Sequence, residues 1–279
     1  MREDIILVAE KPFVSVALAT YNGERWLREQ LESIYAQQDV DVEIIASDDA
    51  STDGTRSILE EYRDRCGLIL LPAVPNLGYK NNFARAIAAC TAPLIALADQ
   101  DDIWDADKLR SLVRELGNDL LVHADVAMMD ENGLIVAPSV RRRNFGGVHD
   151  RVFLDRDYHI ASLLTRKSLC QGCTALFRRE LLDTAFPVPA NEQAHDIWLA
   201  FVAAAHTRVH YIDRSWVRWR VHGANTSQAP MRSPSRSFFK GTFVNGLARR
   251  VFYYRRAAIL RKRGVRLGLY PLRLRDELF

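Results

Sequence analysis

The sequence lacks several features that would place it in a large class of proteins. No stretch of its 279 residues reaches the roughly 18 uninterrupted apolar residues that a membrane-spanning helix needs. No Gly-x-Gly-x-x-Gly follows the first apolar segment, and no Gly-Lys-Ser/Thr loop occurs, which argues against a dinucleotide cofactor and against a P-loop. A globular protein remains, and any nucleotide must be bound by other groups.

Cysteine is also scarce. The four cysteines are Cys66, Cys90, Cys170 and Cys173, and the last two form a single Cys-x-x-Cys pair. A structural zinc site of this kind needs a second pair of ligands, so we predict ordinary reduced thiols. The first ten residues carry acids where a secretion signal is basic, and their apolar run is short, which predicts a cytoplasmic protein.

Acidic residues are almost absent from the C-terminal end. Of the 38 Lys/Arg and 35 Asp/Glu, 13 and 2 lie in residues 232–279, which leaves 25 and 33 for residues 1–231. We therefore predict a main domain at 1–231 and a basic amphipathic helical segment at 232–279. Its apolar stripe suits an anionic membrane surface, and the alternative is a helix packed on the main domain. No nucleic-acid-binding motif accompanies the charge, so we predict no nucleic-acid partner.

What the sequence does contain is a regular alternation of strands and helices. Apolar segments at 13–19, 42–47, 68–71 and 94–98 alternate with helical patterns at 24–37, 56–65 and 83–90. This order predicts an α/β fold with a parallel, doubly wound sheet. The first, second and fourth strands end in polar, acid-bearing loops. If these strands are neighbours, their loops converge at one edge of the sheet, where ligands bind in such folds.

The stretch Leu94–Trp104 is the most informative, because an uncharged apolar run ends in Asp99, Asp101 and Asp102. Carboxylates at the end of a buried strand repel one another and resist desolvation. A divalent cation relieves both costs, and carboxylates with few other ligands suit Mg²⁺ or Mn²⁺ shared with substrate phosphates. The alternative is a solvated acidic turn that caps the helix expected from Asp105.

Seven short motifs between residues 13 and 228 resemble, in the same order, the inverting glycosyltransferases of sequence family 2, especially their bacterial rhamnosyltransferase-like branch. They are Val14–Gly23, Ile45–Thr55, Asn76–Tyr79, Asp99–Trp104, Gln171–Thr174, His195–Leu199 and Arg220–Asn225. The resemblance implies a single Rossmann-like domain of the A-type nucleotide-sugar fold with a mostly parallel central sheet. Residues 13–104 would be its nucleotide-binding half, and residues 105–231 its acceptor half.

The resemblance also implies roles for single residues. Asp196 would be the catalytic base, Asp101 would bind the metal, and His222 would approach the metal and the diphosphate. Asp49 would accept a hydrogen bond from the N3–H of uracil or thymine, for which a charged acceptor is well suited. The other nucleotide-binding positions would be Thr20, Asn22, Glu24, Asn76, Gly78, Asn82 and Asp99. The positions bordering the sugar and the acceptor would be Gly172, Cys173 and Trp198.

The expected reaction is a metal-dependent inverting transfer from a dTDP- or UDP-sugar, with dTDP-rhamnose as a candidate donor. The acceptor would be a saccharide or lipid-linked glycan of bacterial surface polysaccharide synthesis, and the cation Mg²⁺ or Mn²⁺. If the basic segment binds lipid, the enzyme would be peripheral at the inner face of the membrane. Two alternatives stay open, a nucleotidyltransferase and an inactive carbohydrate-binding or scaffold protein on the same fold.

Simpler explanations exist for several of these residues. Asp196 at a helix start is also favoured by the helix dipole. Turn and cap chemistry also explains Asp49, and it is the preferred explanation for Asp53. Residues 139–150 are expected to form a mobile loop whose three arginines, Arg141, Arg142 and Arg143, either grip an anionic acceptor or are solvated.

Overall fold

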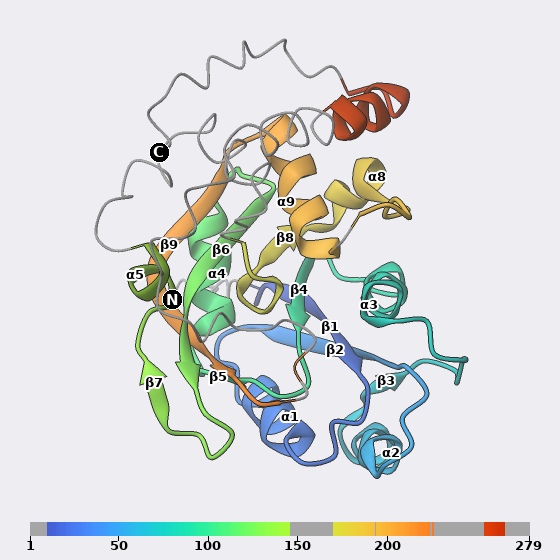
Figure 1. The fold of residues 1–279 in the computed structure, drawn as a ribbon, viewed down its shortest axis with the longest axis vertical. Coiled ribbons are helices and arrows are strands. Elements are labelled where there is room, and N and C mark those ends of the chain that lie inside the picture. The colour runs from blue at the N-terminus through green and yellow to red at the C-terminus, as the bar shows by residue number, and fades with distance from the viewer. Residues whose placement is uncertain (1–9, 146–169, 193, 224, 226–253, 266–279) are drawn as a thin grey trace, which may run out of the picture.

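The computed structural model describes residues 10–145, 170–192, 194–223, 225 and 254–265 (Figure 1). Its strands are β1 (Phe13–Thr20), β2 (Asp41–Asp48), β3 (Ile69–Leu70), β4 (Leu94–Ala98), β5 (Ile103–Trp104), β6 (Leu121–Met129), β7 (Ile135–Ala137), β8 (Leu176–Arg178) and β9 (Val209–Arg220). Its α-helices are α1 (Leu27–Tyr35), α2 (Thr55–Cys66), α3 (Tyr79–Ala88), α4 (Lys108–Leu116), α5 (Val140–Phe145), α8 (Leu182–Ala185) and α9 (His195–His206). Residues 254–262 are helical as well.

All the described strands belong to one mixed sheet in the order β3-β2-β1-β4-β8-β6-β9-β5, with β7 paired to β6. The four strands of the first half are parallel neighbours, with Val14 opposite both Val42 and Leu94. The chain direction reverses at β8, which is antiparallel to β4 and β6, while β6 and β9 are parallel. This confirms the predicted α/β fold with a mostly parallel sheet, and it brings the ends of β1, β2 and β4 together.

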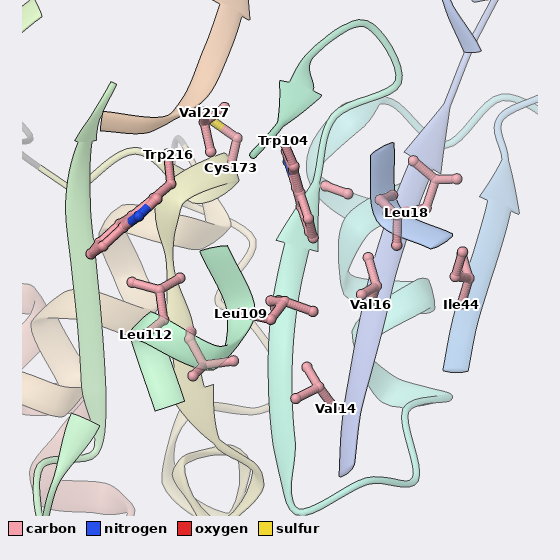
Figure 2. Packing of buried hydrophobic residues seen from close by; sticks show 14 of the residues in the cluster. Val14, Val16, Leu18, Ile44, Trp104, Leu109, Leu112, Cys173, Trp216 and Val217 are labelled. Carbon is pink, nitrogen blue, oxygen red and sulfur yellow. The ribbon is translucent and has the colours of Figure 1, made fainter. Parts of the chain in front are cut away.

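Side chains alternate across the sheet, so each strand contributes to two cores. On β1, Val14, Val16 and Leu18 pack with α1, α2 and α4, whereas Ala17 and Ala19 pack with α3, α8 and α9. Figure 2 shows the first core, in which Leu109 and Leu112 of α4 face the strands. Helices therefore cover both faces of the sheet and leave the strand ends for other uses.

The second half of the chain adds elements that the local pattern does not show. Ile103–Trp104, before the helix expected from Asp105, forms the short strand β5 against β9. β9 is a single long strand with irregular register against β6. Val140–Phe145, expected as a mobile loop, is the helix α5, because Asp125 accepts hydrogen bonds from the Ser139 hydroxyl and the Arg141 backbone. Residues 146–150 lie outside the described residues.

The described part of the C-terminal segment packs against the rest of the chain. Leu260 is fully buried and joins the same core as α9. An apolar helix such as α9 needs cover on most sides, and residues 254–262 supply part of it (red in Figure 1). Residues 232–253 and 266–279, on which the membrane prediction mainly depends, lie outside the described residues. None of the helices in the described ranges has the length and hydropathy of a membrane span.

Candidate active site

The loops after β1 and β2 are bonded to one another. The Thr20 hydroxyl at the end of β1 donates to Asp48 Oδ1 at the end of β2, over 2.9 Å. The Asn22 side-chain oxygen accepts from the backbone of the β2–α2 loop at 2.8 Å, and the Glu24 carboxylate accepts from Gly54 N–H at 2.8 Å. Three residues predicted to bind nucleotide therefore lie at the same strand ends, with Asn22 and Glu24 exposed and Thr20 buried beneath them.

Asp49 organises the loop that leads into α3. Its two carboxylate oxygens accept hydrogen bonds from Leu77 N–H at 2.6 Å and Gly78 N–H at 2.9 Å, while the Asn76 side chain donates to the Asp49 carbonyl. Gly78 has φ +78°, which favours glycine. The Asn82 amide donates to the carbonyl of the last β1 residue at 3.1 Å. Asp49 is only 2% exposed, so a direct contact with a base requires this loop to move.

The acidic loop after β4 lies beside these groups. Gln100 both accepts from and donates to the backbone of Tyr21, at 2.8 and 2.9 Å, and so joins this loop to the one after β1. Asp101 is 7% exposed and Asp102 is fully buried, while Asp99 is half-buried. The predicted convergence of the ends of β1, β2 and β4 is therefore confirmed.

Burial and neighbouring negative charges oppose the ionisation of two carboxyl groups in this loop. Burial, together with the charges of Asp101 and Asp196, raises the pKa of the Asp99 carboxyl to about 7. Burial and the charges of Asp101 and Asp99 also raise the pKa of Asp102 well above its ordinary value. Both pKa values are raised, as expected where nearby positive charge does not balance the negative charge of a buried site.

A buried lysine, Lys108 of α4, lies near these carboxylates. It is 1% exposed, its Nζ donates to the Cys173 carbonyl at 2.7 Å, and the same nitrogen lies 3.0 Å from the centroid of the Trp104 ring. Burial lowers the pKa of Lys108, while the charges of Asp102 and Asp99 act in the opposite sense. Lys108 belongs to none of the motifs of the sequence, and its place six positions after Asp102 is the signal that could have found it.

The residues that follow β9 contact Asp101. His222 Nε2 lies 2.8 Å from Asp101 Oδ2, and the Asn225 amide nitrogen lies 3.4 Å from the same oxygen. The His222 ring packs against Trp26 with centroids 4.1 Å apart. Arg220 donates through its backbone N–H to Asp102 and through Nε to the Asp101 carbonyl. The structure thus brings Asp101 and His222 together as predicted, and it adds Arg220 and Trp26.

The segment at Gly172–Thr174, a single 3₁₀ turn, approaches the acidic loop from β8. One ligand atom each from Asp99, Asp102 and Cys173 lies within 4.8 Å of the others. Burial raises the pKa of the Cys173 thiol, so it stays protonated and is a poor metal ligand. None of the four cysteines forms a disulfide, in agreement with the prediction of reduced thiols.

Asp196 stands at the start of α9. Its Oδ2 accepts from Gly172 N–H at 3.0 Å and its Oδ1 from the next backbone N–H at 2.7 Å, so the carboxylate is held in one orientation. Asp196 is half-buried, and its negative charge contributes to the raised pKa of Asp99. The preceding His195 is stacked on Phe83 at 4.1 Å, and burial lowers the His195 pKa.

Trp198, predicted to border the acceptor, lies in the core instead. It is fully buried, and its indole N–H donates to the Ala185 carbonyl at 2.7 Å. Two residues along a helix correspond to a rotation of about 200°, so Trp198 and Asp196 occupy nearly opposite faces of α9. This placement argues against a contact between Trp198 and an acceptor.

The residues present fit a hard divalent cation. The donor set at the end of β4 is dominated by carboxylate oxygens, the ligands that Mg²⁺ and Mn²⁺ prefer, and His222 adds an imidazole that Mn²⁺ tolerates. The raised pKa values of Asp99 and Asp102 indicate that added positive charge would be favourable here.

The arginines of 141–143 have structural partners. Arg141 pairs with Asp213 at 2.6 Å, and its side chain is only 12% exposed. Arg142 lies 3.5 Å from the same carboxylate, and Arg143 contacts the sulfur of Met128. Of the two expectations for these arginines, solvation is therefore wrong for Arg141.

In open α/β sheets ligands bind at the carboxyl ends of the parallel strands, and the acids of this chain gather at that edge. The family model for glycosyl transferase family 2 matches residues 15–186. The chain belongs to this family and is a glycosyltransferase. Family membership removes the nucleotidyltransferase alternative.

One curated relative is the dTDP-rhamnosyl transferase RfbG of Shigella flexneri. It is 33% identical over 229 residues, which cover 75% of each protein. The putative glycosyltransferase EpsH of Bacillus subtilis is 26% identical over 91% of this chain and 70% of its own length.

Solved structures share the fold at lower identity. Staphylococcus aureus TarS in complex with UDP superposes with a TM-score of 0.59 at 18% identity, over 92% of this chain and 66% of TarS residues 1–349. The mannosyltransferase PcManGT of Pyrobaculum calidifontis, in complex with GDP-Man and Mn²⁺, gives a TM-score of 0.54 at 22% identity, over 74% of this chain and 56% of its own. Both are A-type glycosyltransferases, which confirms the predicted fold type.

Proposed function

We propose that the chain transfers a sugar from a nucleoside diphosphate donor to a hydroxyl group of an acceptor, with inversion at the anomeric carbon. The observation that carries this proposal is that the turn at Gly172–Thr174 joins Asp196 to the acidic loop. Gly172 N–H donates to Asp196 Oδ2 at 3.0 Å, and a ligand atom of Cys173 lies within 4.8 Å of those of Asp99 and Asp102. A candidate base and a candidate phosphate site therefore adjoin one another.

The donor nucleotide would lie on the loops after β1 and β2. Thr20, Asn22 and Glu24 lie at these strand ends, and Asn76, Gly78 and Asn82 border them. Asp49 would recognise a uracil or thymine ring after the loop at 76–78 shifts. The similarity to RfbG favours dTDP-rhamnose among dTDP- and UDP-sugars.

Asp101 would hold Mg²⁺ or Mn²⁺ with help from His222, and Asp99 would contact the ribose or metal-bound water. The bound cation would offset the negative charge that develops on the departing diphosphate. Arg220 joins the end of β9 to the acidic loop through its bonds to Asp101 and Asp102.

Asp196 would take the proton from the acceptor hydroxyl. The acceptor oxygen then forms a bond to the anomeric carbon while the bond from that carbon to the diphosphate breaks, and the proton stays on the Asp196 carboxylate. General-base help of this kind is worth about 10²–10⁴-fold in rate. The bonds from Gly172 and from the α9 backbone keep this carboxylate in place.

The acceptor would approach along Gly172 and Cys173, and a saccharide or lipid-linked glycan of a bacterial surface polysaccharide is the class we favour. The exposed face of the helix at 254–262 carries Arg255, Arg261 and Lys262. Three cations on one face support peripheral contact with an anionic membrane, because each contributes about 1 kcal/mol near such a surface.

The test is release of the nucleoside diphosphate from dTDP-rhamnose and UDP-sugars by wild type and by Asp196→Asn, with Mn²⁺ or with EDTA. We expect Asp196→Asn to bind the nucleotide with unchanged affinity and to lose at least about 10²-fold in kcat. Full activity of Asp196→Asn would refute the role of Asp196 as base.

A further inference from the structure

The buried charged pair Glu192–Arg256 takes no part in the chemistry above. Glu192, in the loop before α9, is 6% exposed, and Arg256, on the helix at 254–262, is 2% exposed. Arg256 Nε donates to Glu192 Oε1 at 2.9 Å and its Nη2 donates to Oε2 at 2.5 Å. Two parallel bonds from a planar guanidinium fix the carboxylate in direction as well as in distance.

Arg256 touches the chain on both sides of Asp196. Glu192 lies four residues before Asp196, and Phe201 lies five residues after it. The guanidinium carbon of Arg256 lies 5.1 Å from the centroid of the Phe201 ring. One side chain therefore ties the loop before α9 to the second turn of α9, and Asp196 lies between the two contacts.

Other bonds hold the same loop. Arg263, at the end of the helix at 254–262 (red in Figure 1, near α8 and α9), donates to the carbonyls of Thr184 at 2.7 Å and Pro187 at 2.6 Å. From the other side, Lys80 of α3 donates to the carbonyls of Ala190 at 2.7 Å and Glu192 at 3.1 Å. The loop is thus held between the helix at 254–262 and α3.

We propose that Arg256 is a positioning residue for Asp196, acting through Glu192 and Phe201. The inference rests on the proposed role of Asp196 as base. A buried ion pair contributes little net stability because desolvation offsets the attraction, so the geometry that its two bonds impose is the property that matters here. Both partners lie beyond residues 15–186, so the family model does not contain this device.

The first test replaces both partners together, as Glu192→Leu/Arg256→Met. The replacement removes the directed bonds but leaves no unpaired charge, so the thermal midpoint is expected to stay close to that of wild type. We expect kcat to fall about 10- to 100-fold, because small displacements of a catalytic group have effects of this size. The donor KM should change little. An unchanged kcat would overturn the proposal.

Arg256→Lys provides a graded variant, since it keeps the charge and loses the bidentate geometry. We expect its kcat to lie between those of wild type and the double variant. A kcat for Arg256→Lys as low as that of the double variant, with an unchanged thermal midpoint, would also support the geometric role. An effect of the double variant on donor KM alone would contradict it.

The matched control is Arg178→Met. Arg178 donates to the carbonyls of Asp119 and Gly117 and pairs with Leu94, at the end of β4 that is remote from Asp99. We expect this variant to lose stability while keeping kcat within about twofold of wild type. If kcat follows the thermal midpoint equally in both variants, the effect of Arg256 is merely structural and the proposal fails.

A double-mutant cycle separates this inference from the function on which it rests. If Arg256 acts through Asp196, Glu192→Leu/Arg256→Met should cost less than about twofold in the Asp196→Asn background. A further loss as large as in the wild-type background would refute the positioning role. Full activity of Asp196→Asn alone would instead refute the proposed base.

Discussion

Two buried groups of charged residues contrast within this molecule. At the end of β4, Asp99 and Asp102 have raised pKa values because burial and neighbouring carboxylates oppose their ionisation. In the Glu192–Arg256 pair, each charge faces one partner over two hydrogen bonds. The two charges of this pair therefore balance each other within the folded chain. The negative charge at the end of β4 lacks such a balance within the described residues, and this supports the proposal that it binds a cation.

The largest expected effect concerns the balanced pair. Arg256→Met leaves Glu192 buried without its partner, so we expect the free energy of unfolding to fall by about 3–5 kcal/mol. Chemical denaturation of wild type, of the single variant and of Glu192→Leu/Arg256→Met measures this. Equal stability of Arg256→Met and wild type would contradict the contrast between this pair and the acidic loop.

The next effect concerns the acidic loop. Asp101→Asn removes a proposed cation ligand, so we expect kcat to fall by at least about 10²-fold while the folded protein is at least as stable without metal. Steady-state assays with Mn²⁺ and thermal unfolding with EDTA measure the two quantities. Loss of activity together with a large loss of metal-free stability would place Asp101 with the scaffold instead.

The pH dependence of stability sharpens the contrast further. Because the folded pKa of Asp99 is about 7, above its ordinary value of 3.8, the folded chain keeps a proton there that the unfolded chain has lost between these pH values. Stability of the metal-free protein should therefore fall as pH rises from about 4 to 7. Comparing wild type with Asp99→Asn in EDTA isolates the effect, and identical slopes would count against it.

The smallest effect concerns Asp53, whose hydrogen bonds come from the start of α2 and from the loop after β1. It accepts from the backbone and the hydroxyl of Thr55 and from the backbone of Glu24. Although burial acts to raise the pKa of Asp53, these hydrogen bonds lower it overall. We expect Asp53→Ala to cost about 1 kcal/mol of stability and to change kcat little, as measured by denaturation and assay. A loss of activity as large as that of Asp101→Asn would contradict this.

Much of the first half was predictable from the sequence, because its strands and helices have strong local periodicity. The strand-end acids Asp99 and Asp101 were predictable for the same reason, since a buried strand directs its end to the edge of the sheet. The short strand β5 was not, because it exists only through pairing with β9, which lies more than a hundred residues later.

The parts of the site that were missed depend on long-range contacts. Lys108 and Arg256 act through partners on other elements and belong to none of the motifs of the sequence. Trp198 was placed wrongly because it lies near Asp196 in the sequence but on another face of α9.

The central claim is that the acidic end of β4 forms a metal-dependent donor site, and calorimetric titration of dTDP and UDP tests it most directly. Wild type should bind one of these nucleotides with Mn²⁺ and lose at least about tenfold in affinity with EDTA, while Asp101→Asn should bind weakly in both conditions. Equal affinity of wild type with Mn²⁺ and with EDTA, unchanged in Asp101→Asn, would contradict the account.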